Sequence, residues 1–142
     1  MHVVRERVFV DSGPWIAFAS ARDGHHTEAA LLFQRAVSTR VPLITTNLVV
    51  AAVQRLLLLR AGRAVAQVFL DRLDRSPALR LVFAKAEHHE RARAWLDKLD
   101  DQVVSYTDAV SFAVVESERC SAVMTFDQDF TVAGFRRYAV TK

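Results

Sequence analysis

Short apolar runs alternate along this chain with longer segments whose apolar residues recur every three or four positions. The short runs predict buried β-strands, and the longer segments predict helices that pack one face on a core. The expected strands cover residues 8–10, 41–45, 79–83, 122–126 and 137–140, the last at an edge. Strands that are apolar throughout and alternate with helices favour a parallel sheet covered on both faces. We therefore predict an α/β protein: a three-layer α/β/α sandwich with a central parallel sheet of four to five strands, in a single domain spanning residues 1–142.

The longest apolar stretch, residues 48–59, is interrupted by Gln54 and Arg55, so it predicts a buried helix and not a membrane span. Asn47 is expected to cap this helix. The first residues lack the apolar core of a secretory signal. Cys120 is the only cysteine, which excludes an internal disulfide and a cysteine-based zinc site. These features together predict a cytoplasmic protein without a membrane contact.

The basic side chains are sixteen arginines against three lysines, although the formal net charge is only +3. Arginine makes bidentate contacts with phosphate more readily than lysine does, so nucleic acid is a candidate partner. Bias in genome composition explains the same excess equally well. Arginines that could line an RNA groove, with an ordinary solvated face as the alternative, are Arg55, Arg60, Arg63, Arg136 and Arg137.

Three aspartates stand at the expected carboxyl edge of the sheet. Asp11 directly follows the first strand, Asp127 directly follows the fourth, and Asp108 lies at the start of an apolar helix. Ligands of open parallel sheets bind beyond the carboxyl ends of the strands. Crowded carboxylates raise one another's pKa unless a cation neutralises them, and oxygen ligands suit Mg²⁺ or Mn²⁺. Without a Walker loop, a nucleophile elbow or a His/Cys cluster, this pattern favours metal-assisted hydrolysis of a phosphodiester.

Each acid also has a purely structural interpretation. Asp11 could cap a short helix, and Asp108 could be a first-turn acid that offsets a helix dipole. Asp127 and Asp129 could form a turn. The coincidence of three acids at one predicted edge is what favours a metal site over these separate roles.

Four blocks of the sequence resemble PIN-domain proteins, particularly VapC-like toxins of type II toxin–antitoxin systems. The resemblance implies an α/β/α nuclease fold and an endoribonuclease that depends on Mg²⁺ or Mn²⁺. It also implies a structured RNA substrate such as tRNA or rRNA, inhibition by a VapB-like antitoxin, and a homodimer. The blocks that carry it are Val8-Phe9-Val10-Asp11-Ser12, Thr45-Thr46-Asn47-Leu48-Val49-Val50-Ala51, Tyr106-Thr107-Asp108-Ala109-Val110-Ser111-Phe112 and Thr125-Phe126-Asp127-Gln128-Asp129-Phe130.

The resemblance assigns roles to individual residues. Asp11, Asp108 and Asp127 match the metal-binding and catalytic acids, and Asp129 matches a less regular additional metal ligand. The residues expected to support these acids from nearby are Ser12, Asn47 and Thr107.

One position departs from the family pattern. The family has a glutamate in the buried helix, and Ala52 stands where that catalytic acid is expected. No acid between Glu28 and Asp71 can replace it. The substitution predicts impaired nuclease activity, whether it was introduced to silence a toxic enzyme or arose naturally. The alternative function is a non-catalytic RNA- or antitoxin-binding module of the same fold.

Two histidine pairs and one tryptophan could suggest further sites. His25-His26 and His88-His89 are adjacent in sequence, so each pair cannot share a helix face, and we expect solvated residues at helix starts. Trp15 lies close to Asp11 and could stack on a base, but packing of the first helix is the favoured role.

Overall fold

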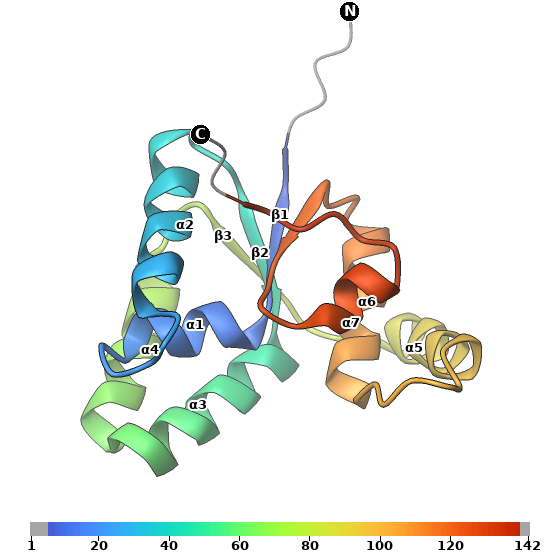
Figure 1. The fold of residues 1–142 in the computed structure, drawn as a ribbon, viewed down its shortest axis with the longest axis horizontal. Helices are drawn as coiled ribbons and strands as arrows, with labels where there is room; N and C mark the ends of the chain where they lie inside the picture. Colours follow the sequence, from blue (N-terminus) through green and yellow to red (C-terminus); the bar gives the residue numbers. More distant parts are fainter. Residues whose placement is uncertain (1–5, 140–142) are drawn as a thin grey trace, which may run out of the picture.

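The computed structural model describes residues 6–139, and a four-stranded sheet lies at its centre (Figure 1). All strand pairs are parallel, and the strand order is β3-β2-β1-β4. The register places Val8 opposite both Leu43 and Ala122. The strands are β1 (Val8–Val10), β2 (Leu43–Thr46), β3 (Leu79–Val82) and β4 (Ala122–Met124).

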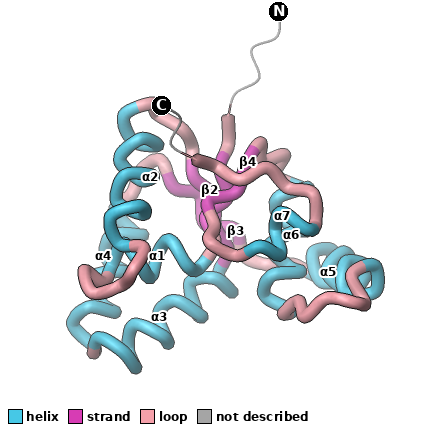
Figure 2. The backbone as a smooth tube through the Cα atoms, in the orientation of Figure 1, coloured by secondary structure: helices cyan, strands magenta, loops and turns pink. Residues whose placement is uncertain are grey.

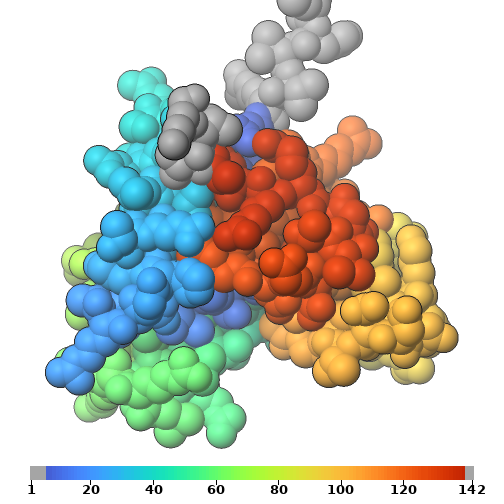
Figure 3. Space-filling model, in the orientation of Figure 1, coloured from blue at the N-terminus to red at the C-terminus, as the bar shows by residue number. Residues whose placement is uncertain are grey.

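Helices cover both faces of this sheet. Figures 1 and 2 show α1 to α4 on one side and α5 to α7 on the other, and the colours of the space-filling view in Figure 3 divide in the same way. This arrangement confirms the predicted three-layer α/β/α sandwich. The helices are α1 (Ser12–Ala19), α2 (His26–Ser38), α3 (Asn47–Ala61), α4 (Arg63–Arg75), α5 (Ala86–Lys98), α6 (Tyr106–Ser117) and α7 (Gln128–Val132).

The neighbouring strands β1 and β4 are buried along their whole length, as their apolar sequences predict. Phe112 of α6 packs its ring edge-on against Phe130 of α7, with centroids 4.9 Å apart. Both phenylalanines are essentially inaccessible to water. Burial of such large side chains is what stabilises the layer of α6 and α7.

The prediction that the apolar residues 48–59 form a buried helix is wrong for one side of α3. Only Val49, Val53 and Leu57 are buried, at i, i+4 and i+8, whereas Leu58 and Leu59 are 43% and 68% exposed. The helix is therefore half covered, because only one of its faces packs on the rest of the protein, mainly on α4 and α1. Among the described residues, no helix is long and apolar enough to cross a membrane.

The cap of α3 also differs from the prediction. Thr46, not Asn47, is the N-cap, and its side chain accepts a hydrogen bond from the Val49 N–H at 3.1 Å. Asn47 is the first helical residue, and its Oδ1 accepts from the Ala84 N–H at 2.9 Å. Asn47 thus ties the start of α3 to the segment that follows β3.

The fifth strand expected at 137–140 is reduced to one isolated parallel bridge between Val123 and Arg137, and residue 140 lies outside the described residues. The prediction that His88 is solvated is wrong. His88 is buried in the first turn of α5, and its Nδ1 accepts a hydrogen bond from the Lys85 N–H at 3.0 Å. Trp15 packs in the core against Phe33, with ring centroids 4.9 Å apart.

Candidate metal centre

The carboxyl edge of the sheet brings three aspartates together. Asp11 joins β1 to α1, Asp127 lies just beyond the neighbouring strand β4, and Asp108 is in the first turn of α6. One carboxylate oxygen of each lies within 4.8 Å of those of the other two. Asp11 and Asp127, which are far apart in sequence, meet here because the parallel neighbours β1 and β4 end at the same edge.

Asp11 is the buried member of the group, with 4% of its surface exposed. The Thr125 hydroxyl donates a hydrogen bond to its Oδ2 at 2.8 Å. Burial raises the pKa of this carboxyl group, and the negative charge of Asp127 adds to the rise, while hydrogen bonds from Ser12 and Thr125 oppose it. A charged Asp11 is therefore costly unless a cation lies beside it.

Asp108 is only partly buried and sits where the dipole of α6 favours a negative charge. Its backbone N–H donates to the Oγ of Ser105, the N-cap of the helix, at 3.1 Å. Desolvation, followed by the charges of Asp11 and Asp127, raises its pKa to about 7. Near neutral pH the metal-free centre therefore carries a carboxyl group that is partly protonated.

Thr125 positions Asp127 as well as Asp11. Its Oγ1 accepts from the Asp127 N–H at 2.9 Å while the same hydroxyl donates to Asp11. Asp127 in turn accepts from the Asp129 N–H at 2.9 Å, which makes it the N-cap of α7. Sequence reasoning missed Thr125, and its only signal was a hydroxyl residue beside Asp127 at the end of a strand.

Asp129 is not a member of the group that could hold a metal ion. Desolvation and the neighbouring Asp127 raise the pKa of its carboxyl group. Asp129 lies in the first turn of α7, next to the N-cap Asp127, and its role as an additional ligand stays a prediction.

The remaining predicted residues lie around this edge in different ways. Ser12 begins α1 and hydrogen-bonds Asp11. Thr107 precedes Asp108 in α6, and its carbonyl accepts from the Ser111 hydroxyl at 3.0 Å. The amide oxygen of Asn47 is engaged by Ala84. Ala52 is half-buried on α3 and offers no polar atom.

The donor set fits a hard divalent cation. Three carboxylate oxygens at this spacing provide the all-oxygen ligands that Mg²⁺ and Mn²⁺ accept, with the remaining positions filled by water or phosphate. Burial first, and then repulsion between the carboxylates, raises the pKa of Asp11 and of Asp108, and a cation bound there would offset both effects. Asp11, Asp108 and Asp127 are thus the residues that would hold the ion.

A family model for the PIN domain matches residues 8–136. The chain belongs to the PIN-domain family. A curated relative, the 23S rRNA-specific endonuclease VapC20 of Mycobacterium tuberculosis strain CDC 1551 / Oshkosh, is 33% identical over 129 residues, which cover 90% of this chain and 95% of the relative. VapC20 of strain H37Rv matches equally well. These matches confirm the resemblance to VapC-like toxins.

Solved structures agree with this assignment. The crystal structure of Mycobacterium tuberculosis VapC20, described as a sarcin–ricin loop cleaving toxin, superposes with a TM-score of 0.82 and 30% identity over 94% of this chain and 99% of that one. VapBC2 from Rickettsia felis, bound to a promoter DNA fragment, gives 0.68 at 10% identity over 92% and 95% of the two chains. FitAcB from Neisseria gonorrhoeae gives 0.65 at 14% over 92% and 96%. The last two show the shared fold alone.

Proposed function

We propose that this chain is a metal-dependent endoribonuclease, acting as one domain, and the toxin of a VapBC-like toxin–antitoxin pair. The observation that carries the proposal is the meeting of Asp11, Asp108 and Asp127 within 4.8 Å in a PIN fold. A Mg²⁺ or Mn²⁺ ion bound there would supply a water of lowered pKa and positive charge for a phosphoryl group. Such a centre suits hydrolysis of a phosphodiester.

The protein's own residues prepare this centre in three ways. Thr125 fixes the Asp11 carboxylate and the Asp127 backbone relative to each other. The N-terminal turn of α6 favours the charged form of Asp108, which partly offsets its desolvation. Burial of Asp11 keeps water away from one side of the ligand set, so a charge placed there interacts strongly.

The proposed substrate is the sarcin–ricin loop of 23S rRNA. The support is the identity to VapC20, which is described by that specificity and is aligned along nearly its whole length. The chain would then act in the cytoplasm, where ribosomes are found. A VapB-like antitoxin is the proposed inhibitory partner, and a homodimer is the proposed assembly.

Ala52 limits the activity that we propose. A glutamate carboxylate from α3 would complete the acid set, and alanine at this half-buried position supplies neither charge nor hydrogen bond. The same observation supports the second candidate, a PIN-type module that binds RNA or antitoxin without cutting. The two differ in what happens when the acid is restored.

The test compares RNA cleavage by the protein and by Ala52→Glu, each with Mn²⁺, with Mg²⁺ and with chelator. A positioned acid or base contributes about 10²–10⁴-fold to a rate, so we expect metal-dependent cleavage of sarcin–ricin loop RNA to rise by about that factor. Ala52→Gln is the matched control, because it has nearly the same size and no charge, and it should not restore activity.

A second control tests whether a contaminating nuclease causes the cleavage. Asp11→Asn in the Ala52→Glu background should return cleavage to the background level. If Ala52→Glu binds the RNA and leaves it intact with both metals, the nuclease proposal fails and the non-catalytic module stands.

A further inference from the structure

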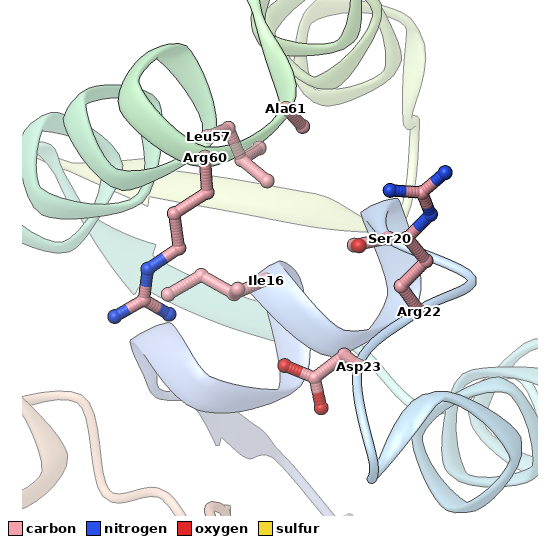
Figure 4. A pocket seen from close by; sticks show the side chains of 7 residues that line it. All are labelled: Ile16, Ser20, Arg22, Asp23, Leu57, Arg60 and Ala61. Carbon is pink, nitrogen blue, oxygen red and sulfur yellow. The ribbon is translucent and has the colours of Figure 1, made fainter.

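A hollow of about 240 Å³ opens between the C-terminal ends of α1 and α3. Figure 4 shows Arg60 reaching down from α3 beside Ile16, and Arg22 on the opposite side of the hollow below Ala61. The two guanidinium groups therefore flank one depression from two different elements. Its lining residues are Ile16, Ser20, Arg22, Asp23, Leu57, Arg60 and Ala61.

Arg22 and Arg60 have no acceptors in the described part of the protein. Within residues 6–139, neither makes a hydrogen bond, an ion pair or a contact with an aromatic ring. Among the described residues, at least four arginines are paired with acids: Arg80, Arg91, Arg136 and Arg137. Two unpaired guanidinium groups at one hollow offer donors that match phosphate oxygens in geometry and charge.

The residues at the floor of the hollow favour a charged ligand over an apolar one. Ile16 and Leu57 are only 9% and 1% exposed, so an apolar side chain inserted there would remove little hydrocarbon surface from water. Asp23 is the one anion in the lining, and its Oδ1 already accepts from the His25 N–H at 2.8 Å. A ligand held by negative charge is therefore favoured over a peptide held by an apolar anchor.

The position of the hollow relates it to the acid centre. Asp11 caps the helix that carries Ile16, and Ala52 lies on the helix that carries Arg60. Eight residues separate Ala52 from Arg60, which is about 12 Å along a helix. A polyanion that lies on the acid centre and continues along the surface of α1 and α3 would reach this hollow.

We propose that this hollow binds the phosphodiester backbone of the RNA substrate, with Arg22 and Arg60 donating hydrogen bonds to its phosphates. The inference rests on the proposed function, because it assumes that RNA occupies the acid centre. It adds a second binding site on the same strand, which positions the RNA before any cleavage.

The test measures binding, so that it does not depend on catalysis. Fluorescent sarcin–ricin loop RNA is titrated with the protein in Ca²⁺ over a range of salt concentrations. The variants are Arg22→Gln with Arg60→Gln combined, and Arg93→Gln as the matched control. Arg93 lies in α5, which Figure 1 places on the far side of the sheet.

We expect the double variant to bind at least ten times more weakly than the parent, with an unchanged melting temperature. Each lost phosphate contact on a single strand lowers the slope of log K against log salt by about 0.7, so the slope should fall by about 1.4. Arg93→Gln should change neither affinity nor slope. An unchanged slope, an equal loss in the control, or no RNA binding by any version would overturn the inference.

A protein ligand for the same hollow is tested with a helical peptide rich in Glu and Leu. If the double variant loses this peptide but keeps the RNA, the hollow is a protein-docking site and the inference is wrong. The two proposals can be refuted separately. RNA left intact by Ala52→Glu would refute the nuclease proposal. Unchanged RNA affinity of the Arg22→Gln, Arg60→Gln double variant would refute only the proposal that the hollow binds RNA.

Discussion

Replacing Asp108 with asparagine should make the metal-free protein more stable at pH 7.5. The pKa of Asp108 rises from 3.8 to about 7 in the folded chain, so the folded state binds its proton more tightly than the unfolded state does. Between these two values the unfolded chain loses the proton first. Stability from this group is therefore fully present below pH 3.8 and is lost as the pH rises to about 7. Asparagine has no such proton to lose.

The size of the effect follows from the shift. About three pKa units correspond to about 4 kcal/mol of stability. Asp108 is partly open to solvent, which screens its charge, so we reduce this figure to about 2 kcal/mol. For a chain of this size that free energy corresponds to a melting temperature about 4–8 °C higher.

Thermal unfolding in chelator at pH 7.5 and at pH 4 measures this difference. Asp108→Asn should melt higher than the parent at pH 7.5 and nearly equal to it at pH 4. Asp71→Asn, on an exposed face of α4, is the matched control and should change neither value. A variant that melts lower than the parent at pH 7.5 would show that Asp108 stabilises the fold and would refute the electrostatic argument.

Three further outcomes test the centre and its supports. Mn²⁺ at about one hundred times its Kd should stabilise the protein by about 2.7 kcal/mol in thermal unfolding, and Asp11→Asn should abolish this gain; equal gains in both proteins would contradict the assigned ligands. Thr125→Val should cost about 1–3 kcal/mol in urea unfolding, because the buried Asp11 loses its donor, and Thr125→Ser should recover most of that loss. Asn47→Ala should cost about 1 kcal/mol, because the Ala84 N–H loses its acceptor, and an unchanged urea midpoint would show that water replaces it.

The sequence predicted the fold well because its signals are local. The apolar runs of β1 and β4 and the i, i+4 spacing in the helices report burial that each segment needs whatever its neighbours are. The edge strand at 137–140 was overpredicted, since one apolar run does not reveal how many hydrogen bonds a neighbour offers. The burial of α3 was overestimated for a related reason: composition shows that Leu58 and Leu59 are apolar, not that another element covers them.

The candidate site also has features that the sequence predicted and features that only the tertiary structure reveals. Asp11, Asp108 and Asp127 could be placed at one edge from sequence, because each follows a strand or opens a helix and parallel strands end together. Their separations, the pKa of Asp108 and the role of Thr125 depend on side chains from strands and helices far apart in the sequence. The same is true of the unpaired Arg22 and Arg60, which are neighbours only across the hollow. Sequence alone therefore determined the elements and the kind of chemistry, whereas tertiary packing decided which charges meet, since desolvation and Coulomb interactions depend on distance and burial in the folded state.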